Sequence, residues 1–429
     1  MSNKNKNNKP QCLFYTTYYQ SYIDNLYIKN SALEEYSYEE QKKYIHEQRF
    51  GDSDFYSRGL IKTGWIAEDF ISNSLQLQKS WARDNNFNYK NEDEIIIEQI
   101  KRLKPEVVYL HNMGIGTTEF LETIRPYTKL IVGQIACPVV KQTDFKKFDI
   151  IISSFPHFVN RFRNSDITAY YQPLAFDPKI LYNIKKNKRH YPITFVGSIS
   201  SNHEKGQQLL EALAENVPID FWGYGIDQLS KNSNIRKRHH GEAWGNEMFS
   251  IFTQSKITVN RHIDVAENYA NNMRLFEATG CGALLITDYK DNLDDLFRIG
   301  KEVVAYRNIE ECIELIKYYI NHPDEATKIA KAGQKRTLEN HTYDIRMKQT
   351  AKILEKHLQK ERKFKDDNQN INYPFKSKNN TNSKASVEKK QYFDIEKDVY
   401  KDLVERPDKL WKNINDGIQY FNKTTIPDD

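Results

Sequence analysis

Long apolar runs are missing from this 429-residue sequence. No stretch approaches the roughly 20 apolar residues that a membrane-spanning helix needs. Residues 1–10 are polar and lysine-rich with no apolar segment behind them, which does not fit a secretory signal. We expect this segment to be disordered, and both absences predict a cytoplasmic protein.

Cysteine is also scarce, with only Cys12, Cys137, Cys281 and Cys312, all far apart. No pair has the CxxC or Cys/His spacing of a structural zinc site. Each cysteine lies in an apolar setting, so we expect buried, reduced thiols, which fit a reducing compartment.

Charge of one sign is not in large excess either. The chain has 63 basic and 58 acidic residues, a formal net charge of +5, and the charges are interleaved. This balance does not indicate a nucleic-acid partner, which would need basic and aromatic residues gathered on one face. The densest basic cluster, 236–240, is interpreted as a solvated loop, with peripheral contact to phosphate or anionic lipid as the alternative.

Three common catalytic motifs are absent: the GxSxG elbow, the HExxH helix and the GxxxxGK[ST] loop. The acids Asp291, Asp294 and Asp295 are clustered, but a solvated helix start explains them. The function must therefore be sought in the organisation of the chain.

The first half alternates short apolar runs with polar stretches of helix length. Continuous apolar runs suit strands that are covered on both faces of a sheet. The expected strands are 12–15, 107–110, 130–133 and 150–153, and the expected helices are 92–102 and 117–124. This alternation predicts a doubly wound parallel sheet for residues 11–175. The pattern does not order the elements of residues 21–83.

A second α/β series follows a proline-containing linker at 172–178. Its expected strands are 193–196, 219–222, 257–259, 283–286 and 303–305. A helix is predicted from one apolar stripe, namely Ile309, Cys312, Ile313, Ile316 and Ile320. We expect a second Rossmann-like domain at 191–358 and a binding cleft between the domains, at the carboxyl ends of their strands.

The composition changes after this second domain. Residues 360–390 are rich in Asn, Lys, Ser and Asp and are predicted to be a linker. Apolar periodicity returns in residues 391–429, which predicts a helical tail and a candidate surface for a partner.

The most informative segment, 271–288, predicts a short helix, a glycine-flanked turn and a buried strand. Arg274 and Glu277 share one face of that helix, whereas Phe276 points nearly opposite. Such a pair suits a nucleoside diphosphate-sugar, with the cation on the diphosphate and the carboxylate on the ribose. A surface salt bridge is the alternative from spacing alone.

Two histidines follow strands of the first half. His111 comes directly after 107–110 and precedes a glycine-rich turn, so we expect it to face the cleft. There it would hydrogen-bond a ligand or act as a general base, with a purely structural histidine as the alternative. His157 is the weaker candidate and is interpreted as a loop residue.

Several segments together resemble one known family. Residues 272–288, Asn-Met-Arg-Leu-Phe-Glu-Ala-Thr-Gly-Cys-Gly-Ala-Leu-Leu-Ile-Thr-Asp, resemble the signature of the CgeB-like (spore-maturation) glycosyltransferases, which are related to the group 1 GT-B transferases. The same pattern appears in 195–198, 221–225, 255–262 and 341–343. The resemblance covers residues 193–358.

The resemblance implies a GT-B fold, in which two Rossmann-like domains face a cleft, here followed by the helical tail. It implies a glycosyltransferase that moves a sugar from a nucleoside diphosphate donor to a glycan, a protein or a lipid-linked saccharide. It implies neither a metal ion nor a cofactor. The first domain would hold the acceptor and the second the donor.

The resemblance also implies roles for single residues. Glu277 would bind the donor ribose, with Arg274 or Asn272 near the diphosphate. Backbone N–H groups of the Gly197-Ser198 turn would bind the phosphates, for which a plain strand-to-helix turn is the alternative.

Tyr224 would stack on the base, with a surface tyrosine as the alternative, and Asn260 would hydrogen-bond the donor or the acceptor. His111 resembles the histidine that many GT-B enzymes hold against the sugar. The chain departs from the group 1 pattern in one respect: those relatives often carry a glutamate eight positions before the ribose-binding one. Here that position is Tyr269, and the nearest acid is Glu267. A non-catalytic binding or assembly module is therefore the alternative function.

Overall fold

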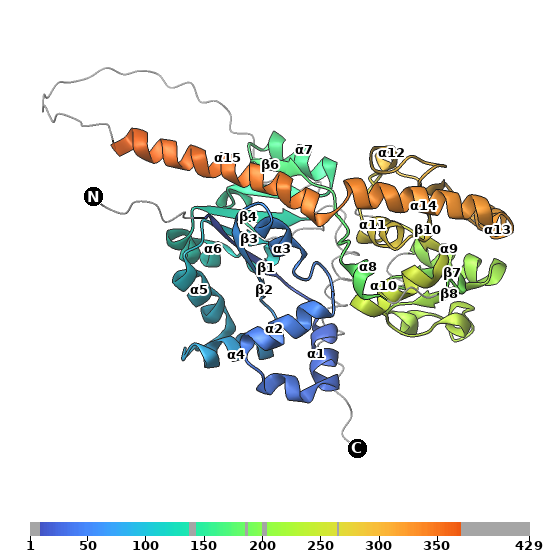
Figure 1. Cartoon of the computed structure of the whole chain (residues 1–429), viewed down its shortest axis with the longest axis horizontal. Coiled ribbons are helices and arrows are strands. Elements are labelled where there is room, and N and C mark those ends of the chain that lie inside the picture. The colour runs from blue at the N-terminus through green and yellow to red at the C-terminus, as the bar shows by residue number, and fades with distance from the viewer. Residues whose placement is uncertain (1–8, 137–142, 185–187, 200–203, 264–265, 370–429) are drawn as a thin grey trace, which may run out of the picture.

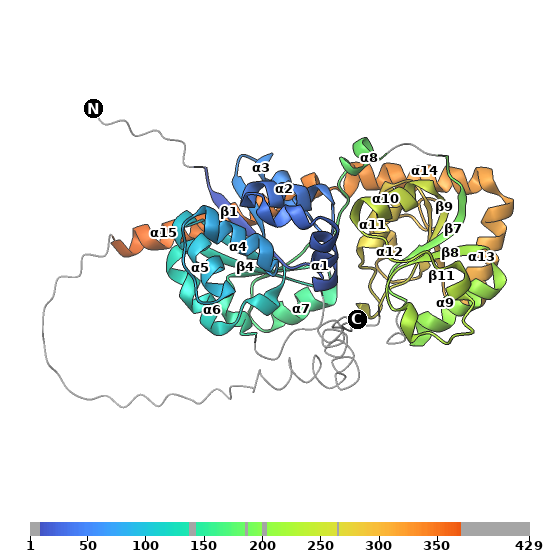
Figure 2. The same ribbon diagram turned by 90° about the horizontal axis from the view of Figure 1, so that it is seen from below.

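The computed structural model describes residues 9–136, 143–184, 188–199, 204–263 and 266–369. Cys137, residues 1–8 and residues 370–429 lie outside the described residues, and with them most of the predicted linker and the whole predicted tail. Two parallel sheets form the centres of two lobes, as Figure 2 shows. No helix in the described ranges is both long and apolar enough to cross a bilayer.

The first lobe is built on a parallel sheet in the order β2-β1-β3-β4-β5-β6. Its strands are β1 (Gln11–Thr16), β2 (Ile66–Ile71), β3 (Val107–Leu110), β4 (Leu130–Ile135), β5 (Ile150–Ser153) and β6 (Ala169–Tyr171). The four expected strands are confirmed, whereas β2 and β6 were not expected. Both are edge strands: β2 carries Glu68 and Asp69 within its apolar run, and β6 is only three residues long.

Helices cover both faces of this sheet. They are α1 (Gln20–Lys29), α2 (Tyr38–Glu47), α3 (Phe55–Ile61), α4 (Leu75–Asp84), α5 (Glu92–Leu103), α6 (Thr118–Ile124) and α7 (Pro156–Asn164). The expected helices at 92–102 and 117–124 are confirmed as α5 and α6. Asn91 caps α5 by accepting a hydrogen bond from Glu94 N at 3.2 Å, and Lys104 ends it in the left-handed region.

The second lobe has the strand order β11-β10-β9-β7-β8, again all parallel. Its strands are β7 (Tyr191–Val196), β8 (Ile219–Trp222), β9 (Ser255–Asn260), β10 (Leu284–Asp288) and β11 (Val304–Tyr306), which confirms all five expected strands. Its helices are α9 (Glu204–Asn216), α10 (Gly245–Gln254), α11 (Met273–Gly280), α12 (Leu293–Leu296), α13 (Ile309–Asn321) and α14 (Pro323–Asn340).

The predicted apolar stripe is correct for α13 except at its end. Cys312 and Ile316 are fully buried, but Ile320 is 36% exposed and the buried position next to it is Tyr319. The three described cysteines, Cys12, Cys281 and Cys312, are buried free thiols, as expected. Burial raises the pKa of all three.

The last described helix, α15 (Tyr343–Gln369), returns to the first lobe and lies along it (Figure 1). Met347 on α15 packs against Gly59 on α3, where a Cβ would lie 2.7 Å from Met347 Cγ. The predicted second domain, 191–358, therefore includes a segment that packs on the first domain. The helix also extends through 360–369, where a linker was predicted.

The chain crosses between the lobes twice, and the two crossings are hydrogen-bonded to each other. The first crossing leads from β6 to α8 (Ile180–Asn183), and the second joins α14 to α15. Phe176 N donates to His341 O at 2.9 Å, and Tyr343 N donates to Phe176 O at 3.2 Å. These hydrogen bonds hold the two crossings together at the boundary between the lobes.

Candidate functional site

Helix α11 carries the Arg274–Glu277 pair at the carboxyl edge of the second sheet. Asn272 begins the helix, because its side chain accepts a hydrogen bond from Leu275 N at 3.2 Å. The helix ends in a turn in which Gly282 has φ +78°, a conformation that favours glycine. The helix, turn and strand expected at 271–288 are thus confirmed.

Arg274 and Glu277 contact each other directly through Arg274 Nη1 and Glu277 Oε2. Arg274 Nε also donates to Val196 O at 2.8 Å, which holds the guanidinium at the carboxyl end of β7. The Glu277 side chain is 5% exposed and that of Arg274 24% exposed. Burial raises the pKa of Glu277, and the charge and hydrogen bond of Arg274 offset only part of that rise.

His111 lies at the carboxyl end of β3 in the first lobe, as predicted. Its ring packs in an aromatic cage of Phe14, Tyr56 and Tyr109, with centroid separations of 5.6, 4.2 and 5.1 Å. His111 Nδ1 lies 3.3 Å from Asp52 Oδ2. Nε2 is buried with no hydrogen-bond partner in the described ranges.

Asp52 joins these parts of the site. Its second oxygen, Oδ1, accepts a hydrogen bond from the Tyr343 hydroxyl at 2.7 Å. The Asp52 charge adds to the rise in the pKa of Glu277, and the charges of both acids contribute to raising the pKa of Tyr343, whose largest cause is burial. Direct contacts therefore join Asp52 to His111 and to Tyr343, and the charge of Glu277 acts on Tyr343.

Sequence reasoning missed Asp52 and Tyr343 as site residues. Asp52 lies in the irregular segment between α2 and α3, with no periodic pattern around it. Tyr343 was part of the 341–343 family segment, but nothing in that segment indicates a contact with a residue near position 50. Only the return of α15 to the first lobe brings the two together.

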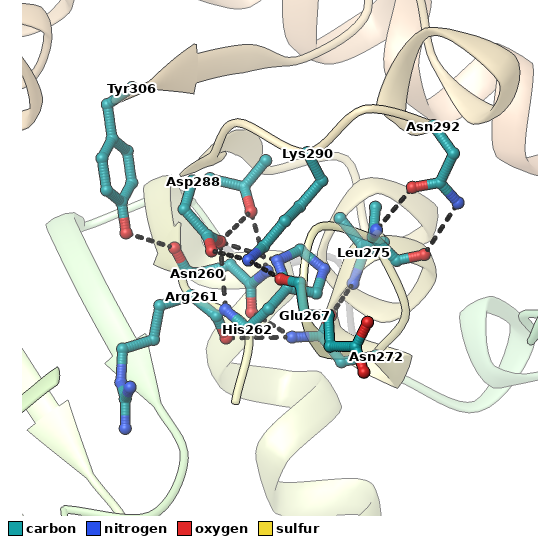
Figure 3. Close-up of polar contacts among 12 residues, drawn as sticks. Asn260, Arg261, His262, Glu267, Asn272, Leu275, Asp288, Lys290, Asn292 and Tyr306 are labelled. Atoms are coloured by element: carbon teal, nitrogen blue, oxygen red, sulfur yellow. Dashed lines mark hydrogen bonds and ion pairs between the residues drawn. The ribbon is translucent and has the colours of Figure 1, made fainter. Parts of the chain in front are cut away.

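Asn260 and Asn272 lie side by side, but their amides bind each other and the protein (Figure 3). Asn272 Nδ2 donates to Asn260 Oδ1 at 2.8 Å and to Arg261 O at 3.1 Å. Asn260 Nδ2 donates to Thr287 Oγ1 at 2.9 Å, and Asn260 is 3% exposed. The network ties α11 to β9 and β10, and the predicted ligand contacts of both residues stay predictions.

A second buried histidine lies beside this network. His262 Nδ1 and N both contact Asp288 Oδ1, at 2.7 and 3.0 Å, and Lys290 Nζ lies 3.5 Å from Asp288 Oδ2 (Figure 3). Burial alone would raise the pKa of Asp288, but His262 and Lys290 more than offset this, so the pKa is lowered. His262 belongs to the 255–262 family segment, but the sequence analysis predicted no role for it.

The backbone of Gly197, which was expected to bind the phosphates, is engaged within the second sheet. Its N–H donates to Trp222 O at 2.9 Å, so it is already engaged between β7 and β8. Gly223 has φ +145°, and a Cβ there would lie 1.8 Å from Gly197 O. These contacts favour a plain turn at Gly197, and phosphate binding by Gly197 and Ser198 stays a prediction.

Tyr224 lies in an aromatic contact between the lobes. Its ring stacks on Trp244 at 5.8 Å and 18°, and Tyr19 of the first lobe approaches it edge-on at 6.2 Å. Tyr19 also contacts Phe50 at 5.7 Å. Trp244 therefore covers one face of the Tyr224 ring. Stacking of a base on Tyr224 stays a prediction.

Another contact between the lobes involves Tyr269, at the position where the group 1 relatives often carry a glutamate. Tyr269 stacks on His157 of α7 at 4.9 Å and 18°. Glu267 forms an ion pair with Arg161 of α7 at 2.9 Å. His157 therefore lies at the junction of the lobes, packed against the β9–α11 segment.

Comparisons with known proteins agree with this architecture. A family model described as glycosyl transferase-like matches residues 202–352. A comparison of the sequence with curated proteins gives no match. A glycosyltransferase from Rickettsia africae has a similar structure, with a TM-score of 0.51 and 14% identity over 82% of this chain and 99% of that one. Sucrose-phosphate synthase from Thermosynechococcus elongatus has a TM-score of 0.52 and 11% identity over 81% of this chain and 99% of that one.

The identities are low, so the likeness to these structures concerns the fold. The matched segment, 202–352, contains α11 with Arg274 and Glu277, together with Asn260 and Asn272. The chain has the two-domain GT-B fold, and its second domain carries a glycosyl transferase-like segment.

Proposed function

We propose that this chain is a glycosyltransferase that transfers a sugar from a nucleoside diphosphate donor to an acceptor hydroxyl. The observation that carries the proposal is the Arg274–Glu277 pair on α11, a helix that Asn272 caps, with Arg274 bound to Val196 O at the carboxyl end of β7. The glycosyl transferase-like match includes this pair. Membership of the CgeB-like group rests on the resemblance of residues 272–288.

Each charged group has a role in this proposal. Glu277 accepts hydrogen bonds from the ribose hydroxyls, and Arg274 offsets the charge on the diphosphate. The acceptor oxygen bonds to the anomeric carbon while the bond from that carbon to the diphosphate breaks, and its electron pair leaves with the diphosphate. His111 Nε2 takes the proton of the acceptor hydroxyl. No step in this scheme uses a metal ion.

The acceptor is a glycan, a protein or a lipid-linked saccharide, held mainly by the first lobe. A non-catalytic binding module is the second candidate function. It is favoured by Tyr269, which occupies the position of the missing glutamate and stacks on His157. Release of free sugar from a nucleotide-sugar separates the two functions, because a binding module hydrolyses no donor.

Nucleotide binding tests the proposal through the melting temperature with UDP, GDP, dTDP, ADP and CMP. A nucleotide that binds only the folded chain at about 100 times its Kd adds about 2.7 kcal/mol of stability. We expect one diphosphate to raise the melting temperature of the wild type but not that of Glu277→Gln. Glu98→Gln, in a helical ion pair with Arg102 on α5, is the control and should respond like the wild type.

Failure of all five nucleotides to stabilise the wild type would remove the main support for a donor site. Stabilisation that persists in Glu277→Gln would place the nucleotide elsewhere. Each variant is compared with its own nucleotide-free melting temperature, because loss of a buried charge also changes stability.

A further inference from the structure

The His111 ring has two nitrogens in different surroundings. Nδ1 lies 3.3 Å from Asp52 Oδ2, whereas Nε2 is buried and has no partner in the described part of the chain. The His111 side chain is 6% exposed, and the rings of Phe14, Tyr56 and Tyr109 surround it. A neutral imidazole carries a hydrogen on only one of its two nitrogens. Which nitrogen carries it determines whether Nε2 donates or accepts a hydrogen bond.

Asp52 receives two contacts, one on each oxygen. The Tyr343 hydroxyl is 2.7 Å from Oδ1, and His111 Nδ1 is 3.3 Å from Oδ2. A carboxylate only accepts hydrogen bonds, so Nδ1 must carry the hydrogen in this pair. The Tyr343 hydroxyl donates to the other oxygen, which restricts rotation of the carboxylate and keeps Oδ2 directed at His111.

Tyr343 is itself held firmly. Its ring packs against Phe55 at 5.0 Å and Tyr56 at 5.3 Å, and its N–H donates to Phe176 O in the first crossing. It is the first residue of α15, directly after the second crossing. The contact that steadies Asp52 therefore comes from the segment that joins the two lobes.

We propose that Asp52 and Tyr343 are positioning residues that hold His111 as the Nδ1–H tautomer, so that Nε2 accepts a hydrogen from a ligand hydroxyl. This inference rests on the proposed function for the identity of that hydroxyl. The tautomer itself follows from this chain's own contacts. Because Tyr343 begins α15 directly after the second crossing, a shift of the lobes that moves α15 also releases Asp52 and the tautomer of His111.

The test is the tautomer of His111, read from ¹⁵N shifts of the imidazole in the full chain labelled with ¹⁵N-histidine. His111→Gln assigns the signals. We expect the wild type to show Nδ1–H with an unprotonated Nε2. In Asp52→Asn the amide N–H₂ can face Nδ1, so the ring should change to the Nε2–H tautomer. Tyr343→Phe keeps the ring packing but removes the hydroxyl, so both tautomers should be populated.

Asp344→Asn is the matched control. Asp344 follows Tyr343, is exposed and pairs with Lys62 at 2.6 Å, so its loss should leave the His111 spectrum unchanged. An Nε2–H tautomer in the wild type would overturn the proposal, and so would a wild-type spectrum in Asp52→Asn. If Asp52→Asn does not fold, the wild-type tautomer and Tyr343→Phe decide the matter.

Catalysis and nucleotide binding provide a second readout. Asp52→Asn should lower kcat by about 100-fold or more while the donor KM changes little, because Arg274 and Glu277 are intact. Melting-temperature shifts with the nucleoside diphosphate should persist in Asp52→Asn and Tyr343→Phe. Absence of any such shift in the wild type would count against the proposed function, whereas the tautomer result stands independently of it.

Discussion

The polar side chains around α11 mostly bind one another, and this gives the site its rigidity. Asn272 makes three hydrogen bonds: it caps α11 at Leu275 and contacts both Asn260 and Arg261. Asn260 continues the network to Thr287 at the end of β10. Arg274 and Glu277 can therefore keep a fixed position relative to β7, β9 and β10 without a ligand.

Asn272→Ala tests this structural role. The substitution removes a helix cap and leaves the Asn260 amide oxygen without its donor, so it should lower the free energy of unfolding by about 2–3 kcal/mol. Urea unfolding measures the change. Asn321→Ala removes an exposed amide at the end of α13 that donates to Lys317 O at 3.0 Å, and should cost less than about 0.5 kcal/mol. Equal losses of unfolding free energy in the two variants would show that the network around Asn272 adds no stability.

At the scale of elements, the start of α10 holds the lobes together on one side. Gly245 has φ +49°, and a Cβ there would lie 2.0 Å from Gln48 O in the first lobe. Asn246 N donates to Gln48 O at 3.0 Å, and Asn246 Oδ1 accepts from Arg49 Nη1 at 3.0 Å. The absence of a side chain at Gly245 is what allows this close approach.

Gly245→Ala should push α10 away from residues 47–50. We expect the free energy of unfolding to fall by about 1–3 kcal/mol and the radius of gyration in small-angle scattering to rise. Gly241→Ala is the control: it also has positive φ, +93°, but no atom lies within 4 Å of the added Cβ. If Gly241→Ala raised the radius of gyration as much as Gly245→Ala, the role given to the Gly245–Gln48 contact would be wrong.

The element order was largely predictable because most strands are continuous apolar runs. Nine of the strands were expected from short runs that are wholly or mostly apolar. Two were not: β2 is interrupted by Glu68 and Asp69, and β6 has only three residues. Asp69 is nevertheless 4% exposed, and burial raises its pKa well above the ordinary value. A buried acid in an edge strand leaves no apolar pattern to detect.

The site was predictable only where its residues follow the strands and helices locally. Arg274 and Glu277 were proposed because they share one face of a predicted helix in a segment that resembles the family signature, and His111 because it directly follows a predicted strand. Asp52 reaches His111 and Tyr343 across 59 and 291 sequence positions, respectively. No local pattern carries contacts of that range, so the link between them appears only in the fold.

At the scale of the whole molecule, the two crossings are clamped by one buried cation. Arg346 donates to Pro173 O at 2.8 Å, to Leu174 O at 3.3 Å and to His341 Nδ1 at 2.8 Å. Burial lowers the pKa of Arg346 to about 10. His341 Nε2 in turn donates to Leu296 O at 2.9 Å, so the clamp requires a neutral His341.

Acid should therefore weaken the clamp. Burial lowers the pKa of His341 to about 4, against an ordinary value of 6.5. The unfolded chain binds the proton more readily, so the contribution of His341 is fully present above pH 6.5 and is lost as the pH falls toward 4. The loss amounts to at most about 3 kcal/mol.

Urea unfolding at several pH values measures this dependence in the wild type and in His341→Gln. The difference between the two curves separates His341 from His46, whose pKa burial also lowers to about 4. The variant should lose less stability than the wild type between pH 6.5 and 4. Parallel curves would mean that His341 is not held neutral by the clamp.

The most direct test of the proposed donor site is a crystal structure of the chain with the nucleoside diphosphate that stabilises it. We expect the ribose hydroxyls within hydrogen-bond distance of Glu277 and the diphosphate against Arg274, at the carboxyl end of β7. His111 should lie opposite α11, on the side of the bound nucleotide that faces the first lobe. A nucleotide bound away from α11, with the Arg274–Glu277 pair unchanged and untouched, would contradict the donor site.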